Sequence, residues 1–171
     1  MHNNLLKESW LDTPLGPMLA IADGKALYLL EFADRRGLEG ELERLKVRTK
    51  SAIVSGQTSP IVSIKNELAS YFEGNLQEFK TPFSVCGSLF QKKVWEQLRS
   101  IPYGQTRSYL GQATAIKQPS ASRAVANANG ANQLAIVIPC HRIIRSTGEI
   151  GGYGGGLACK KWLLEHEKRN A

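Results

Sequence analysis

The chain has 171 residues, of which 42% are hydrophobic and 22% are charged. This length suits one domain or two small ones, and the composition supports a packed core and excludes a disordered chain. The 22 Lys and Arg outnumber the 15 Asp and Glu, which gives a formal net charge of +7. No apolar run approaches the ~18 residues needed to cross a bilayer, so we expect no membrane span.

The excess positive charge lies in the second half of the chain. Residues 1–84 carry 10 Lys and Arg against 11 Asp and Glu, whereas residues 85–171 carry 12 against 4. A neutral half beside a basic half is typical of a protein that binds a polyanion, although a lysine-rich soluble surface would give the same counts. We expect a scaffold domain at 1–82 and a functional domain at 83–171.

Three cysteines, at positions 86, 140 and 159, form an odd number without short paired spacings. They predict a reducing compartment and argue against a disulfide framework or a four-ligand zinc site. The three histidines are too scattered to indicate a metal centre. Because the amino terminus lacks the charged and apolar regions of a secretory signal, we expect a cytoplasmic location.

Strands followed by helices are predicted in the first half. The segments are a turn at 13–17, strands at 18–22 and 26–32 around an Asp23-Gly24 hairpin turn, and helices at 37–46 and 60–73. The hairpin follows from the Asp-Gly pair, and the second helix from apolar residues near helical spacing behind Pro60. No set of reactive side chains gathers here, which favours a scaffold role.

Helices dominate the second half. A connector at 80–88 leads to helices expected from 89 to 100, at 108–115, at 120–128 and at 157–168. The middle two are separated by a short turn containing Pro119, which is the spacing of a helix-turn-helix. In the last helix, the apolar spacing predicts a packed face with the following members: Cys159, Trp162, Leu163 and His166. Glu167 at such a position is usually solvated.

The apolar run at 134–138 predicts a core strand, which Pro139 would terminate because it has no N–H to donate. Cys140 would then lie at a rigid strand end with His141 beside it. A thiolate is the reactive form of cysteine and a nearby imidazole can generate it, so this pair indicates a nucleophile. A buried structural cysteine explains the same pattern equally well.

Two further segments permit a functional and a structural interpretation. The helix at 120–128 presents alanine and serine around the single basic residue Arg123, which favours close, shape-based contact with a minor groove. Packing and helix propensity explain its alanines equally well. The glycine-rich run at 151–156 is either a hairpin tip or a pocket wall where backbone approaches a planar ligand.

Together these segments resemble the O6-alkylguanine-DNA alkyltransferases, also called methylated-DNA–protein-cysteine methyltransferases. The resemblance covers most of residues 85–167, and the Pro-Cys-His-Arg core is highly specific. It rests on residues 138–144, on Arg123-Ala124-Val125 followed by Asn129-Gly130-Ala131-Asn132, on 155–167, on 90–95 and on 101–104. The first half agrees more loosely, chiefly at 13–16 and 71–74.

The resemblance implies an α/β (α+β) protein with an N-terminal ribonuclease-H-like α/β domain and a mostly helical winged helix-turn-helix domain. It implies direct-reversal DNA repair by a suicide transferase. A methyl or larger alkyl group would move irreversibly from O6 of guanine, and from O4 of thymine, to Cys140. The implied partner is alkylated double-stranded DNA, bound in the minor groove by a monomer that needs no cofactor, metal, membrane or protein partner.

The resemblance also implies roles for single residues. Cys140 would attack the alkyl carbon, and His141, through a water and with Glu167, would act as the base that activates the thiol. Tyr109 would protonate the departing guanine, and Asn132 would hold the turn that carries the active-site strand. The implied pocket residues are Val137, Arg142, Tyr153, Gly154, Gly155 and Gly156.

DNA contacts are implied for the helix at 119–128. Arg123 would replace the extruded nucleotide, because a thiol fixed in the protein cannot reach O6 inside the base stack. The further DNA contacts are Ser120, Ala121, Ala124, Ala126, Asn127 and Tyr109. Two positions depart from the family pattern. Ala126, where glycine is common, adds a methyl to the groove-facing helix, and Gln133, where proline is common, is expected to loosen the turn.

Three other functions remain open. The first is a non-enzymatic binder of damaged DNA of the alkyltransferase-like type, which the presence of Cys140 opposes. The second is a cysteine hydrolase, whose dyad partners are usually distant in sequence rather than adjacent like Cys140 and His141. The third is a winged-helix regulator that binds specific sequences. Zinc ligands of animal members and the cysteine-rich domain of regulatory members have no counterpart, so we expect no transcriptional role.

Overall fold

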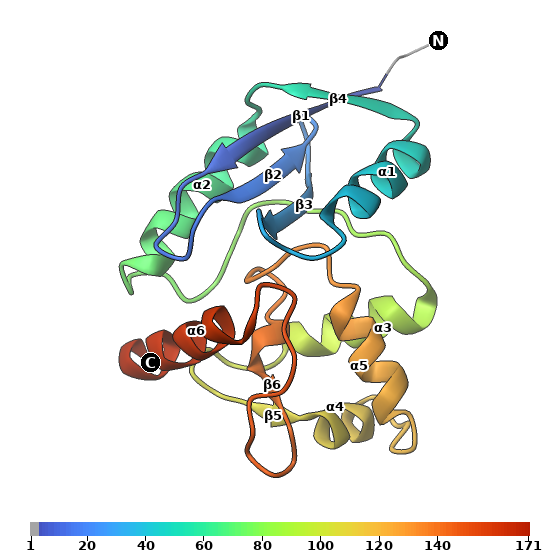
Figure 1. The fold of residues 1–171 in the computed structure, drawn as a ribbon, viewed down its shortest axis with the longest axis vertical. Coiled ribbons are helices and arrows are strands. Elements are labelled where there is room, and N and C mark those ends of the chain that lie inside the picture. Colours follow the sequence, from blue (N-terminus) through green and yellow to red (C-terminus); the bar gives the residue numbers. More distant parts are fainter. Residues whose placement is uncertain (1–3) are drawn as a thin grey trace. The chain divides into compact units, whose positions relative to one another are not determined.

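The computed structural model describes residues 4–171, which divide after Ser84 into two compact units. This division lies close to the boundary expected after residue 82. Each unit has its own secondary structure, as Figure 1 shows, and its own buried core. Across the described residues, no helix combines the length and the apolar character that a bilayer span requires.

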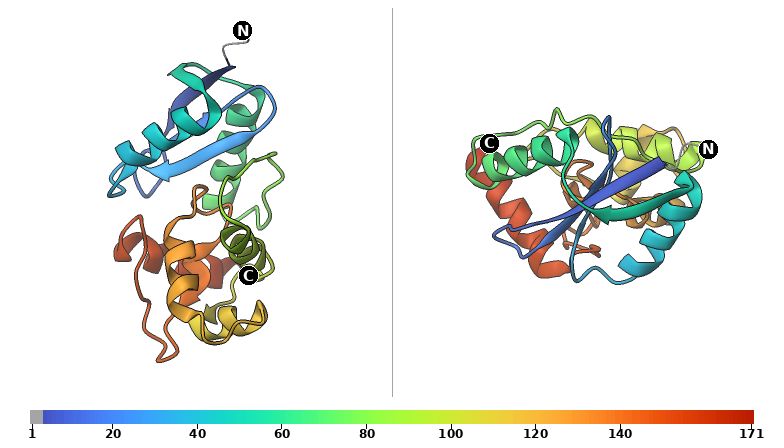
Figure 2. Two further views of the ribbon diagram at one scale, coloured as in Figure 1. Left: turned by 90° about the vertical axis from the view of Figure 1, so that its right-hand side faces the viewer. Right: turned by 90° about the horizontal axis from the view of Figure 1, so that it is seen from above.

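The first unit is a four-stranded sheet with two helices (Figure 1). Its elements are β1 (Asn4–Leu11), β2 (Met18–Ala22), β3 (Leu27–Phe32), α1 (Leu38–Thr49), β4 (Ser51–Ser55) and α2 (Ser59–Phe72). The strand order is β3-β2-β1-β4, antiparallel except that β4 pairs in parallel with β1. All of β2 is buried, since α1 and α2 pack against the sheet (Figure 2).

The expected hairpin and both expected helices of this unit are present, whereas β4 is a strand that the pattern did not predict. Ser51–Ser55 is short and begins and ends with serine, and most of it is at least partly exposed. It therefore lacks the apolar alternation that marks a half-buried strand. Its strand conformation depends on pairing with β1, which is a contact distant in sequence.

The second unit is mostly helical (Figure 1). Its elements are α3 (Leu89–Arg99), β5 (Arg107–Ser108), α4 (Tyr109–Ala115), α5 (Ser122–Gly130), a 3-10 turn (Cys140–Arg142), β6 (Ile143–Ile144) and α6 (Leu157–Asn170). α3 begins with a capping box, in which Ser88 and Gln91 each bond the other's main chain. The expected helix-turn-helix is present as α4 and α5, and β5 pairs in parallel with β6.

The predicted strand at 134–138 is wrong. The segment is buried as expected, but it is a compact turn in which Ile138 N donates to Leu134 O at 3.0 Å and Val137 N donates to Ala135 O at 2.8 Å. Ile136 takes a φ of 72°, an uncommon conformation for a β-branched residue. A short apolar run cannot distinguish a strand from another buried segment, because its backbone partners are not visible in the sequence.

The buried face of α6 also differs from the prediction. Lys160, Leu163, His166 and Glu167 are buried, whereas Cys159 and Trp162 are partly exposed. The apolar spacing placed the buried face about one residue away from its true position, because Lys160 and Glu167 are ionisable and do not contribute to an apolar pattern. Buried ionisable side chains such as these require hydrogen-bond or ion-pair partners inside the unit.

Candidate active site

Asn132 connects the buried turn to the thiol of Cys140. Its Nδ2 donates to Ile138 O at 2.8 Å and lies 3.3 Å from Cys140 Sγ, while its Oδ1 accepts from Leu134 N at 3.0 Å. Cys140 is partly exposed and begins the 3-10 turn directly after Pro139. An N–H aimed at the sulfur favours the thiolate over the thiol, because the hydrogen bond is stronger to the charged form.

Three buried side chains form an ion-pair network behind the thiol. His141 Nε2 lies 2.7 Å from Glu167 Oε1. Arg142 binds both oxygens of the same carboxylate, Nε to Oε2 at 2.8 Å and Nη2 to Oε1 at 3.0 Å, and its Nη1 donates to Ile101 O at 2.7 Å. Glu167 is 1% exposed, so it is not solvated as residues at such helix positions usually are, and it lies against His141, its partner in the role that the resemblance implies. The sequence also assigned Arg142 to the pocket wall, but its guanidinium is bound to Glu167.

The charges in this network favour a neutral histidine beside an ionised carboxylate. Burial lowers the pKa of His141, although Glu167 opposes this effect. Burial alone would raise the pKa of Glu167, but His141 and Arg142 outweigh it and hold that pKa well below its usual range. With Nε2 on the carboxylate, His141 Nδ1 is the ring atom left to accept a proton. That atom is buried and has no hydrogen-bond partner among residues 4–171.

Two further ionisable groups respond to charge on Cys140. Burial and the negative charge of Cys140 raise the pKa of Tyr109, so its hydroxyl stays protonated and can donate. Burial lowers the pKa of Lys160 to about 8, against the opposing effect of Cys140. Lys160 Nζ donates to Gly152 O at 3.1 Å. Sequence reasoning missed Lys160, although its spacing of three residues from Leu163 on α6 could have placed it on the buried face.

The glycine-rich loop borders an open hollow of about 660 Å³ in the second unit. Its lining residues are Arg145, Glu149, Ile150, Gly151, Gly152, Tyr153, Gly156, Leu157, Ala158 and Lys161. Of the expected pocket residues, Tyr153 and Gly156 line this hollow, whereas Gly154, Gly155 and Val137 do not. The Tyr153 ring lies edge-on to the His141 ring, with centroids 6.5 Å apart. The loop therefore lies next to the histidine of the network.

The exposed face of α5 carries small side chains and one long basic side chain. Arg123, Ala124 and Asn127 are exposed, as is Ser120 just before the helix, whereas Ala121 and Ala126 are partly buried. The extra methyl of Ala126 is therefore not fully presented on the outer face. This arrangement fits contact with a shallow surface better than the reading of base edges by several long side chains.

Gln133 fastens the turn that it was expected to loosen. Its Nε2 donates to Cys86 O at 2.7 Å, and its Oε1 accepts from Cys86 N at 3.3 Å. The side-chain amide thus bonds both the N–H and the C=O of a residue 47 positions away in the sequence. These two bonds constrain the backbone at position 133 where the family commonly has the rigidity of proline.

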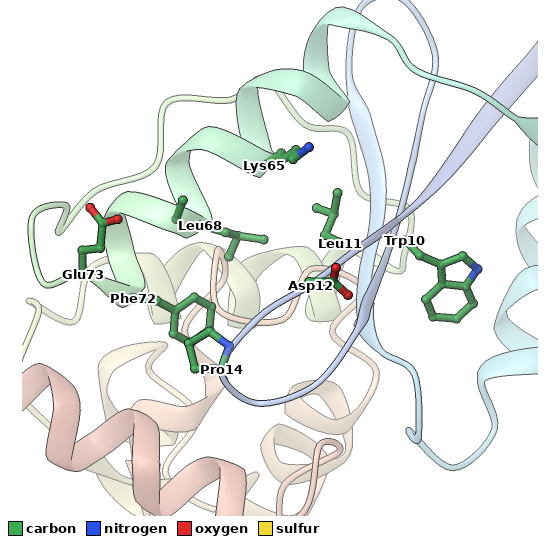
Figure 3. A pocket seen from close by; sticks show the side chains of 9 residues that line it. Trp10, Leu11, Asp12, Pro14, Lys65, Leu68, Phe72 and Glu73 are labelled. Atoms are coloured by element: carbon green, nitrogen blue, oxygen red, sulfur yellow. The ribbon is translucent and has the colours of Figure 1, made fainter.

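The first unit contains a separate pocket of about 400 Å³ between the end of β1 and α2 (Figure 3). It is lined by Trp10, Leu11, Asp12, Pro14, Lys65, Leu68, Ala69, Phe72 and Glu73. None of the residues predicted to be catalytic lies in it. Within residues 4–171, no group of three His, Cys, Asp or Glu side chains is arranged to hold a metal ion. Among residues 4–171, the side chains expected to react lie around Cys140 and not in this pocket.

Comparisons with known proteins agree on one family. Residues 6–85 match the family model of the 6-O-methylguanine DNA methyltransferase, ribonuclease-like domain, and residues 89–169 match its DNA binding domain. A methylated-DNA–protein-cysteine methyltransferase of Mycobacterium bovis is 42% identical over 161 residues, which covers 94% of this chain and 92% of the relative.

Solved structures give the same result. The crystal structure of Mycobacterium tuberculosis O6-methylguanine methyltransferase matches with a TM-score of 0.83 and 37% identity, over 98% of this chain and 95% of that one. The structure of Mycobacterium tuberculosis OGT in complex with DNA matches with a TM-score of 0.80 and 38% identity, over 97% and 94% of the two chains. The likeness therefore extends over both units.

Proposed function

Because this chain belongs to the methylated-DNA–protein-cysteine methyltransferase family, we propose that it repairs DNA by transferring alkyl groups from O6 of guanine to Cys140. We propose O4 of alkylated thymine as a second position from which the alkyl group is transferred to Cys140. The observation that carries it is the placement of a partly exposed thiol against the Asn132 amide, with the buried His141–Glu167 pair beside it. The same placement leaves the thiol accessible to a base brought in from outside.

The chemical step is a displacement at the alkyl carbon. The sulfur of Cys140 supplies an electron pair and forms the S–C bond, while the C–O6 bond breaks and its electron pair stays on guanine. The thiol proton passes through a water to Nδ1 of His141, and the positive charge that develops there is stabilised by Glu167. Tyr109 donates a proton to the departing guanine. The thioether product resists hydrolysis, so each chain reacts once.

DNA binding in this proposal uses the exposed face of α5 in the minor groove. Arg123 fills the space of the nucleotide that rotates out, because O6 is not accessible inside the stack. A related protein of Mycobacterium tuberculosis has been crystallised in complex with DNA, which supports DNA as the partner. All the proposed reacting groups come from one chain, so we propose a monomer that needs no protein partner, acting where DNA is, in the cytoplasm.

The alternative functions have less support. A damage binder without chemistry does not need an accessible thiol held by an amide donor. A hydrolase needs an activated water that attacks a covalent intermediate. In this site, His141 Nε2 contacts Glu167. Because Cys140 and His141 are adjacent in the sequence, we propose that the thiol proton reaches His141 through a water. This arrangement favours activation of the thiol over hydrolysis of a covalent intermediate.

The experiment is a titration of repaired DNA against protein. A duplex with one O6-methylguanine is incubated with increasing protein, and the restored guanine is counted after digestion. We expect the repaired DNA to plateau at one guanine per protein chain, however long the incubation. Repair that continues beyond this ratio would identify a turnover enzyme, and tight binding without repair would identify a damage binder.

A further inference from the structure

Two buried amide side chains face each other inside the helix-turn-helix. Gln112 on α4 is 0% exposed and Asn129 on α5 is 8% exposed. Gln112 Nε2 donates to Asn129 Oδ1 at 2.9 Å, and Asn129 Nδ2 donates to Gln112 Oε1 at 2.8 Å. The two amides thus form a closed ring of two hydrogen bonds between the helices, next to the buried apolar residues Ala113 and Val125.

This amide pair fixes the two helices more strictly than apolar contacts could. Apolar side chains tolerate small shifts, whereas hydrogen bonds weaken steeply with distance and angle. A buried amide that loses its partner also keeps the full cost of its lost hydration. The neighbouring residue Ala128 accepts at its carbonyl from Trp95 Nε1 of α3 at 2.8 Å. The last turn of α5 is therefore held by directional bonds at two successive residues.

The two helices carry different parts of the proposed reaction. Arg123, which would open the base stack, lies on α5. Tyr109, which would meet the extruded base, lies three residues before Gln112 on α4. Tyr109 also follows directly from β5, and β5 pairs with β6, which in turn follows the turn of Cys140. α4 is thus tied to the segment that carries the thiol independently of the amide pair, whereas the amide pair supplies directional hydrogen bonds between α5 and α4.

We propose that Gln112 and Asn129 are positioning residues that hold the flipping helix α5 in register with Tyr109 on α4. The inference rests on the proposed function, and it adds that opening of the duplex and transfer of the alkyl group depend on different residues. Opening a duplex requires the correct placement of Arg123 relative to the pocket, and a displacement of about 1 Å can cost about 100-fold in rate. A free alkylated base needs Cys140 and Tyr109 but no flipping. The amide pair should therefore matter for duplex DNA and not for a free base.

The test compares two double variants with the wild-type protein and with Arg123→Ala. Gln112→Leu with Asn129→Leu removes both amides, so no buried amide is left unpaired. Gln112→Asn with Asn129→Gln exchanges the side chains and keeps an amide pair of the same total length. The rate of transfer is measured from an O6-methylguanine duplex and from free O6-benzylguanine, and the thermal midpoint is measured for each variant.

We expect the leucine variant to remain folded, to react with the free base within about twofold of wild type, and to lose about 10- to 100-fold on the duplex, as Arg123→Ala should. The exchanged variant should recover most of the duplex rate. If the leucine variant loses the same factor in transfer rate on both substrates, or loses none on either, the amide pair has no positioning role and contributes only to packing. Wild-type protein that transfers from neither substrate would instead overturn the proposed function itself.

Discussion

Glu167 links two segments of the second unit that are 25 residues apart in the sequence. Oε1 of its carboxylate contacts His141 Nε2 and accepts from Arg142 Nη2, and Oε2 accepts from Arg142 Nε. This bidentate contact fixes the carboxylate, and the carboxylate in turn orients the imidazole. Arg142 therefore acts on the site through Glu167, although it does not line the pocket.

Glu167→Gln should damage both stability and chemistry. Loss of the charge leaves Arg142 buried without its counter-ion, which costs about 3–5 kcal/mol. Transfer should also slow, because His141 loses the charge that stabilises its protonated form. Urea unfolding and the rate of methyl transfer measure the two effects. Glu165→Gln is the matched control, since Glu165 is exposed on the same helix. Equal urea midpoints and equal transfer rates for the two variants would show that Glu167 supports neither the stability of the protein nor its chemistry.

The pKa directions of His141 and Glu167 predict sensitivity to acid. Burial lowers the pKa of His141 from 6.5, and the pKa of Glu167 lies below 4.5 because His141 and Arg142 outweigh its burial. Both groups bind fewer protons when folded, so their contribution to stability is complete above about pH 6.5 and is lost as the pH falls through the folded values. The urea midpoint should fall as the pH drops below about 6.5, where His141 is protonated in the unfolded chain, and fall further below about 4.5, and Glu167→Gln should lack the Glu167 part of the second fall. A flat wild-type midpoint would contradict this account.

At the scale of elements, the sequence predicted those helices and strands whose turns and apolar spacing are encoded by neighbouring residues. The Asp23-Gly24 turn predicted the hairpin, and the apolar spacing behind Pro60 predicted α2. The turn at 134–138 was not predictable, because its hydrogen bonds go to the side chain of Asn132 and to its own backbone. Apolar spacing did not indicate the burial of Glu167, since its partners come from another element, whereas the spacing of Lys160 from Leu163 was a usable signal for the burial of Lys160.

The glycine-rich loop yields a prediction with a control in the next residue. Gly151 has a φ of 73°, and a Cβ there would lie 3.2 Å from the Tyr109 hydroxyl. Gly151→Ala should therefore strain the loop by about 1–3 kcal/mol and displace Tyr109, slowing transfer about tenfold or more. Gly152→Ala meets nothing within 4 Å and should leave the rate unchanged. Transfer assays on free O6-benzylguanine decide this, and equal rates for the two variants would separate the loop from Tyr109.

At the scale of the whole molecule, charge distribution matches the division of roles. Residues 1–84 are nearly neutral, and the basic excess lies in residues 85–171, which contain both Arg123 and Cys140. Phosphate contacts release counterions, so the affinity for DNA should fall steeply with salt, by about 0.9 in the logarithmic slope for each phosphate neutralised.

Arg123→Ala removes one positive charge that would lie in the groove between the two phosphate backbones, so it should reduce this salt slope by about one, measured by fluorescence anisotropy on an undamaged duplex. Arg48→Ala, at an exposed position of the first unit, should leave the slope unchanged. A slope near zero for the wild-type protein, or equal changes in the two variants, would contradict the assignment of DNA binding to the second unit.

The central claim is that Cys140 is consumed by the alkyl group it removes. The most direct measurement is peptide mass spectrometry of the protein after reaction with an O6-methylguanine duplex. We predict one added methyl on the peptide that contains Cys140 and none on the peptides of Cys86, which is exposed, or Cys159. A methyl on either of the other cysteines, or repaired DNA with all three unmodified, would contradict the account.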